Sequence, residues 1–103
     1  LADKVRIFQR LRAVEGEDAP LAHQLASRLQ RADDRDPEGA EIELDRILAQ
    51  LPAGGERQIL SLWLSGLSLA AIAEELELTP EAVRKRWQRI RESIRDRLLE
   101  EAA

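Results

Sequence analysis

The sequence predicts an all-α protein of about six helices, with a C-terminal helix-turn-helix and a long final helix. Three observations support this fold class. Leu, Ala, Glu and Arg dominate the composition, and all four favour helices. Apolar residues recur every three or four positions, which is the period of a helix. Nowhere does the sequence show the period-two alternation, rich in β-branched residues, that is typical of strands.

The first two helices are expected over residues 2–14 and 20–32. The first carries an apolar face at a spacing of three: Val5, Phe8, Leu11 and Val14. The second has Asp18 as a candidate N-cap and Pro20 near its first position, where proline is favoured. Its apolar face has a spacing of four: Leu21, Leu25 and Leu29.

A polar break over residues 32–37 is expected to separate the second helix from the third. Asp36 is the candidate N-cap of the third helix, and Pro37 its first residue. The apolar side of this helix comprises Ile42, Leu44, Ile47, Leu48 and Leu51. A second break follows over residues 52–55.

The second half of the chain is expected to hold the remaining three helices. The fourth begins at Glu56 and ends at Gly66, and its apolar residues are Ile59, Leu60, Leu62 and Trp63. Ser68 caps a short fifth helix that ends near Leu76. Thr79 caps the last and longest helix, which runs from near Pro80 to near Glu100.

Residues 67–87 are expected to form two helices joined by a tight turn. The inner residues of the pair are Ile72, Ala73, Leu76, Leu78, Val83 and Trp87. Ala73 is small enough for the helices to cross closely, and the apolar stripe continues as Ile90, Ile94 and Leu98. This pattern is typical of a helix-turn-helix, whose second helix enters the DNA major groove.

The outer face of that last helix is basic. The whole chain has a formal net charge of −4, which argues against bulk, nonspecific binding of nucleic acid, but residues 79–97 carry a net charge of +4. A basic stripe confined to one helix can still guide a polyanion. The candidate DNA-binding residues are Thr79, Pro80, Glu81, Arg84, Lys85, Gln88 and Arg89.

Residues 51–99 resemble region 4 of the sigma-70 family of RNA polymerase sigma factors, especially the extracytoplasmic-function type. The matching residues are Leu51-Pro52, the helix over 57–62, Gly66-Leu67-Ser68, Ile72-Ala73, Leu76, the run 83–87, Arg89-Ile90-Arg91, Ile94-Arg95 and Leu98. The resemblance implies that the last helix recognises the −35 element of double-stranded promoter DNA while the domain docks on core RNA polymerase. An anti-sigma factor is a further partner that it suggests.

Three residues depart from the family's pattern. Ala71 stands where Glu is frequent, so the capping box with Ser68 is lost. Glu77 occupies the turn position that usually holds Gly, and a left-handed backbone there would cost about 1 kcal/mol or more. Ala82 replaces the Thr that commonly precedes Val83. None of these differences removes a candidate base contact.

The first half of the chain does not resemble the family's region 2, which melts DNA with exposed aromatics. Its single aromatic residue, Phe8, fits an apolar stripe, so the chain as given is not expected to melt DNA. The sequence therefore predicts an acidic N-terminal helical segment, residues 1–50, followed by the helix-turn-helix domain, residues 51–103. With Leu at position 1 and no Met, the chain is typical of a processed or excised piece.

Two other functions remain open at this point. The first is a LuxR-type transcriptional regulator output domain, although such domains usually have a shorter final helix with a Thr-Val-Lys start. The second is a helical interaction module without DNA binding, which the acidic first half supports. Salt-dependent DNA binding would separate this module from the DNA-binding alternatives.

Enzymatic, metal and membrane functions are not expected. The chain has no Cys, a single His and no glycine-rich phosphate loop, so no catalytic residues, cofactor or metal ligands are assigned. His23 fits a partly exposed helix position, and the acidic run over 33–38 fits a solvated linker. No secretory signal or membrane-spanning run is present in the sequence, which predicts a cytoplasmic protein.

Overall fold

The structure is a computed structural model that describes residues 3–52 and 55–102, with side chains as far as Arg97. These residues form six α-helices and one short 3-10 helix, η1, and they contain no strand, so the predicted all-α fold is confirmed. In chain order the elements are α1 (Lys4–Ala13), η1 (Gly16–Asp18), α2 (Ala19–Arg35), α3 (Gly39–Gln50), α4 (Gly55–Leu64), α5 (Leu69–Glu75) and α6 (Pro80–Ala102).

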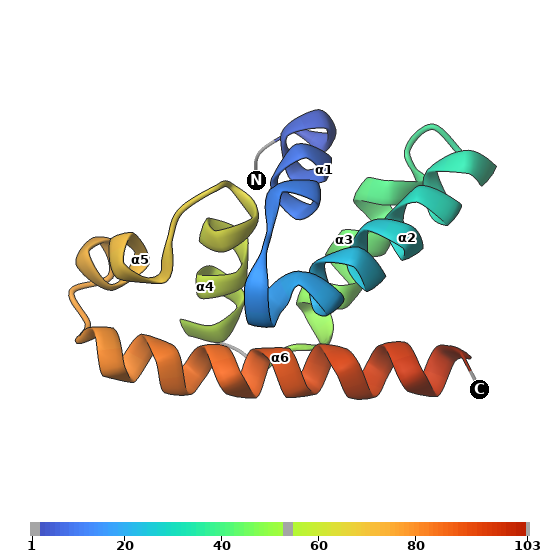
Figure 1. Ribbon diagram of the computed structural model, residues 1–103. Coiled ribbons are helices and arrows are strands. Elements are labelled where there is room, and N and C mark those ends of the chain that lie inside the picture. Colours follow the sequence, from blue (N-terminus) through green and yellow to red (C-terminus); the bar gives the residue numbers. More distant parts are fainter. Residues whose placement is uncertain (1–2, 53–54, 103) are drawn as a thin grey trace.

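The long helix α6 runs along one side of the molecule, and the other helices pack above it (Figure 1). Helices α4 and α5 lie over its N-terminal half, while α2 and α3 lie toward its C-terminal half. Helix α1 contacts both α2 and α4, and therefore links the two groups. No helix among the described residues is long and apolar enough to cross a membrane.

A single apolar cluster holds the helices together, and it includes residues from both halves of the chain. Its members are Ile7, Phe8, Leu11, Leu21, Ala22, Leu25, Leu29, Ala40, Leu44, Leu51, Ile59, Leu60, Trp63, Leu64, Ile72, Ala73, Val83, Trp87, Ile90 and Ile94. The two tryptophans meet at its centre, with ring centroids 4.7 Å apart and ring planes tilted by 42°. The prediction that both are core residues is confirmed.

Two residues predicted to face the core are instead exposed. Val5 is 61% exposed and Ile42 is 53% exposed. Helix α1 buries Ile7 with Phe8 and Leu11, because residues four apart lie on one helical face and the adjacent Phe8 widens it. Helix α3 buries Ala40 and Leu44 in the same four-residue register. Phe8, Leu11, Leu44 and Leu51 are buried as predicted, so the predicted helical spacing is correct and only the first residue of each stripe lies off the buried face.

The predicted break between the second and third helices is displaced. Helix α2 continues to Arg35, so Asp33 is helical, and its carboxylate pairs with Lys4 of α1 at 3.0 Å. Asp36 is the C-cap of α2 rather than the N-cap of α3: its Oδ1 accepts a hydrogen bond from the Glu38 N–H at 3.0 Å. Helix α3 starts at Gly39, two residues beyond the predicted start.

Gly39 lies against the backbone of α2. A Cβ atom at this position would lie 2.0 Å from the Ala32 carbonyl oxygen, so glycine permits the close approach of the two helix ends. The sequence alone could not reveal this contact, because the contact depends on where α2 ends.

The predicted caps of the helix-turn-helix are confirmed. The hydroxyls of Ser68 and Thr79 accept hydrogen bonds from the backbone N–H groups of Ala71 and Ala82, both at 3.1 Å. Gly66, with φ of +109°, ends α4, and the Leu67 N–H donates to the Leu62 carbonyl at 3.2 Å. The contacts at Gly66 and Ser68 fix both ends of the short turn before α5, and the contact at Thr79 fixes the start of α6.

Glu77 adopts the left-handed backbone conformation that the sequence suggested, with φ of +56°. Its N–H donates to the Glu74 carbonyl, and the Leu78 N–H donates to the Ala73 carbonyl at 2.9 Å. These bonds complete the C-terminal cap of α5, a motif that favours glycine at this position. The side chain of Glu77 is exposed, so the strain brings no buried contact in return.

We expect Glu77→Gly to stabilise the protein by about 0.5–1 kcal/mol, because relief of left-handed strain outweighs the added freedom of the unfolded chain. Urea unfolding monitored by tryptophan fluorescence measures the change. Glu75→Gly is the matched control, since this exposed glutamate is helical, and it should lose about 0.5–1 kcal/mol. Equal losses in the two variants would contradict the strain at Glu77.

Candidate nucleic-acid interface

Helices α5 and α6 form the helix-turn-helix that the sequence predicts. Ile72 and Ala73 on α5 are buried, and so are Val83 and Trp87 on α6. Because α5 and α4 both contact this side of α6, its opposite side faces solvent. The stripe continues with Ile90 and Ile94, which are also buried. Leu98 was predicted to extend the stripe, but its side chain lies outside the described part of the structure.

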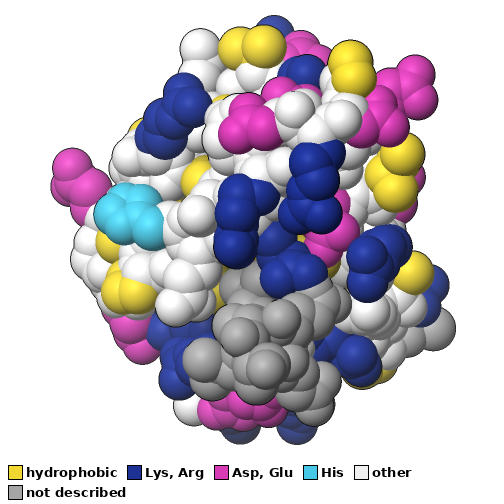
Figure 2. Space-filling view, turned by 90° about the vertical axis from the view of Figure 1, so that its right-hand side faces the viewer, with side chains coloured by type: hydrophobic (Ala, Val, Ile, Leu, Met, Phe, Trp, Pro, Cys, Tyr) yellow, Lys and Arg dark blue, Asp and Glu magenta, His cyan; other side chains and the backbone are white. Residues whose placement is uncertain are grey.

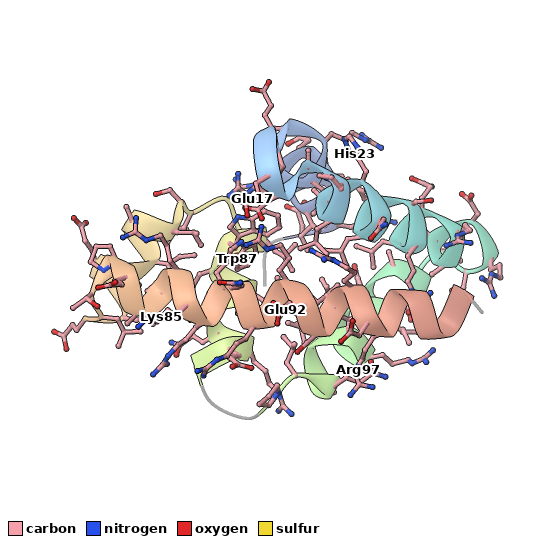
Figure 3. All side chains as sticks on the ribbon, turned by 60° about the horizontal axis from the view of Figure 1, so that its bottom comes forward. Glu17, His23, Lys85, Trp87, Glu92 and Arg97 are labelled. Carbon is pink, nitrogen blue, oxygen red and sulfur yellow. The ribbon has the colours of Figure 1, made fainter. Side chains whose placement is uncertain are left out.

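All seven candidate DNA-binding side chains lie on the exposed part of this unit: Thr79, Pro80, Glu81, Arg84, Lys85, Gln88 and Arg89. In Figure 3, Lys85 and Trp87 lie toward opposite edges of α6, as a helix with one buried face requires. The exposed residues extend from the helix N-terminus over the first half of α6.

The charge of this surface is mainly positive. Arg84, Lys85 and Arg89 form no ion pair within the part of the chain that the structure describes, so their charges are available to an outside anion. Glu81 is the one acidic residue among the seven candidates, and it lies in the first turn, where the helix dipole favours negative charge. A cationic, exposed helix face of this kind suits a polyanion.

A polar network that the sequence did not predict joins η1 to α6. The Trp87 indole N–H donates to Oδ2 of Asp18 at 3.2 Å, and Nη1 of Arg91 lies 3.3 Å from Oδ1 of Asp18. The Arg91 guanidinium also donates to the Glu17 carboxylate at 2.6 Å. Figure 3 shows Glu17 and Trp87 close together, where the corner between α1 and α2 approaches α6.

Asp18 was predicted as an N-cap, and the structure gives its side chain another role. It stands at the N-cap position of α2 but makes no side-chain capping bond. Its Oδ1 is buried without a hydrogen bond of good geometry, so the nearby Arg91 charge compensates it. Pairs 69 and 74 residues apart leave no local pattern in a single sequence, which is why sequence reasoning missed the network.

Arg10 of α1 makes a second unpredicted connection to the helix-turn-helix. Its Nε donates to the Trp63 carbonyl at 2.9 Å, and its Nη2 donates to the Leu67 carbonyl at 3.2 Å. The guanidinium also lies over the Trp63 ring, 4.7 Å from the centroid. Burial lowers the pKa of the Arg10 guanidinium, and the Asp18 carboxylate opposes that change. Helix α1 thereby supplies donors to one carbonyl at the end of α4 and to one in the turn before α5.

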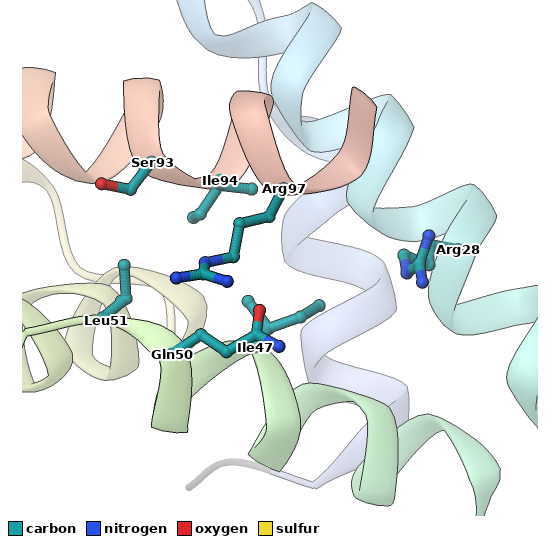
Figure 4. A pocket seen from close by; sticks show the side chains of 7 residues that line it. All are labelled: Arg28, Ile47, Gln50, Leu51, Ser93, Ile94 and Arg97. Carbon is teal, nitrogen blue, oxygen red and sulfur yellow. The ribbon is translucent and has the colours of Figure 1, made fainter. Parts of the chain in front are cut away.

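A second group of basic side chains gathers at the opposite end of the molecule (Figure 2). Arg28, Arg31 and Arg35 of α2 line a polar depression there, and Arg28 pairs with Glu43 of α3 at 2.8 Å. Nearby, Arg97 of α6 extends between α6 and α3, where it lines a small groove together with Leu51 and Ile94 (Figure 4). That groove has a volume of only about 10 Å³, which is too small for an organic substrate.

His23 is exposed on α2, away from any ligand cluster. The described residues contain no group of three or more His, Asp or Glu side chains that could hold a metal ion.

Comparison with protein-family models gives a match to part of the chain. The model described as Sigma-70, region 4 matches residues 41–94, which run from α3 to the middle of α6. Comparison with curated proteins gives no match, and comparison with solved structures gives none either. The match covers the helix-turn-helix and leaves out α1, η1 and α2.

Proposed function

Because the chain belongs to the sigma-70 region 4 family, we propose that it binds promoter DNA sequence-specifically in transcription initiation, recognising the −35 element through α6. Region 4 is a DNA-binding domain of sigma-type transcription factors and not an enzyme family. The observation that carries the proposal is the arrangement of α6, whose buried stripe leaves all seven candidate contact residues exposed on a cationic face.

Each contact residue has a role that suits its chemistry. Arg84 and Lys85 follow the buried Val83 and extend outward near the helix N-terminus, so they can donate to guanine O6 and N7. Glu81 can accept from the amino group of cytosine. Arg89 lies a turn further on and is better placed for a phosphate.

The other exposed residues of the turn complete the interface. Thr79, Pro80 and Gln88 are exposed around the N-terminal part of α6, which would enter the DNA major groove. Contacts to the DNA backbone and to base edges position the helix there. We propose residues 51–103 as the DNA-binding domain and residues 1–50 as a helical segment packed on it. The family further supports docking on core RNA polymerase in the cytoplasm, with an anti-sigma factor as a candidate regulator.

The test is a set of titrations on a selected promoter and on scrambled DNA at several salt concentrations. Arg84→Ala or Lys85→Ala should each cost about 1–3 kcal/mol on the promoter and relax the preference at one or two base pairs. Arg89→Ala should weaken binding to both DNAs alike and reduce the salt slope by about one.

Arg31→Ala is the matched control, because this exposed arginine lies on α2, outside the family match. It should leave promoter preference unchanged. If the parent protein binds neither DNA at low salt, the interaction module without DNA binding becomes the better description. If it binds the two DNAs with equal affinity, sequence-specific recognition is overturned.

A further inference from the structure

Arg91 lies beside the proposed DNA-contact face of α6. Residues seven apart on a helix differ by only about 20° around the axis, so Arg91 continues the edge on which Arg84 lies. Along the axis it is about 10 Å beyond Arg84. In a helix-turn-helix, side chains further along the flank of the recognition helix are suited to backbone phosphates rather than to bases.

The guanidinium of Arg91 already holds two carboxylates. Nη1 lies 2.6 Å from Oε1 of Glu17 and 3.3 Å from Oδ1 of Asp18. The two acids differ in accessibility, since the Glu17 side chain is 79% exposed and that of Asp18 is 24% exposed. Asp18 is also fixed by the Trp87 indole, whereas Glu17 has no second partner among the described residues.

We propose that Arg91 is a further phosphate-binding residue and that the Glu17 carboxylate occupies it in the free protein, competing with the DNA backbone. A carboxylate and a phosphate offer the same kind of oxygen acceptor to a guanidinium. Glu17 and Asp18 already lie against Nη1, which carries only two N–H groups, so a phosphate would be a third anion at this nitrogen and has to replace Glu17. The inference rests on the proposed function, because it needs DNA bound along α6.

The arrangement makes Glu17 easy to displace. An ion pair with one largely exposed partner contributes little to stability, so exchange of Glu17 for a phosphate costs little. Asp18 stays in place during this exchange and keeps Arg91 close to its present position. The acidic corner that precedes α2 then lowers the affinity for every DNA sequence equally and leaves the preference among sequences unchanged.

The test compares Glu17→Gln with Glu15→Gln on the promoter and on scrambled DNA. Glu15 is an exposed acid two residues away that has no ion pair among the described residues, so it reports the general effect of removing one negative charge. We expect Glu17→Gln to raise affinity for both DNAs about two- to fivefold, and clearly more than Glu15→Gln does.

Arg91→Gln supplies the second half of the test. It should weaken binding to both DNAs and reduce the salt slope by about one, and in its background Glu17→Gln should bring no gain beyond that of Glu15→Gln. Arg91→Lys, which keeps the charge beside Asp18, should retain the salt slope. This variant provides the comparison even if loss of the charge impairs folding.

The outcomes separate the two proposals. Equal gains from Glu17→Gln and Glu15→Gln, or a Glu17→Gln gain that persists in Arg91→Gln, would overturn the role of Arg91. A reduced salt slope in Arg91→Lys would also count against it. A parent protein that binds neither DNA would instead overturn the proposed function, and the inference would fail with it.

Discussion

Trp87→Ala is expected to lower the free energy of unfolding by about 3–5 kcal/mol, the usual cost of truncating a buried large aromatic residue. The indole is 2% exposed and packs against Trp63, so its removal leaves a cavity where α4 meets α6. It also removes the donor that satisfies Oδ2 of Asp18. Urea unfolding monitored by far-UV circular dichroism measures the loss.

Trp87→Phe separates the contribution of ring packing from that of the hydrogen bond to Asp18. It retains most of the aromatic packing but lacks the N–H, so its cost should be markedly smaller than that of Trp87→Ala. A Trp87→Ala protein as stable as the parent would mean that Trp87 does not lie in the core. The register of α6, and with it the assignment of Arg84 and Lys85 to the outer face, would then be wrong.

Arg10→Met is expected to cost about 2–3 kcal/mol, because it removes two charge-assisted hydrogen bonds to backbone carbonyls and the contact with the Trp63 ring. Methionine has a similar length and keeps the stem packed, so the change isolates the guanidinium. Thermal unfolding followed by circular dichroism should show a lower midpoint at the same protein concentration.

Arg6→Met is the control, one turn earlier on the same helix. The Arg6 side chain is exposed and makes neither the carbonyl hydrogen bonds nor the Trp63 contact of Arg10. The expected change in the free energy of unfolding therefore lies within about 0.5 kcal/mol. If Arg10→Met cost no more than Arg6→Met, α1 would be stabilised by its apolar residues alone. The guanidinium of Arg10 would then have no special role in holding α1 on the helix-turn-helix.

The sequence predicted the helix-turn-helix better than the helices that precede it. Ser68, Thr79 and Gly66 carry strong local signals, because capping chemistry is decided within a few residues. The buried stripe of α6 was also correct from Val83 to Ile94, since a long helix with one buried face repeats its pattern several times.

Shorter helices gave a weaker signal. Val5 and Ile42 fit a helical period as well as the true core residues do, and only the packing of α1 and α3 against α2 decides which face is buried. The turn before α3 was misplaced for a similar reason, because the close approach of Gly39 to the Ala32 backbone is a tertiary contact that depends on where α2 ends.

The candidate interface divides in the same way. Exposure of the seven predicted DNA contacts followed from the apolar stripe of α6, whereas the contacts of Arg10, Asp18 and Arg91 join residues more than 50 positions apart. Such pairs are fixed by the tertiary arrangement of η1 and α1. No periodicity or capping rule could have found them in one sequence.

The bond between Trp87 and Asp18 bears on how this protein could change over evolutionary time. The indole donor belongs to the family domain, but its acceptor lies in a segment outside the family match. A domain that inherited Trp87 without that corner would carry a donor with its partner missing, at a cost of about 1–3 kcal/mol if it remained buried. Related proteins should therefore either have both the tryptophan and the N-terminal segment that carries Asp18, or lack both.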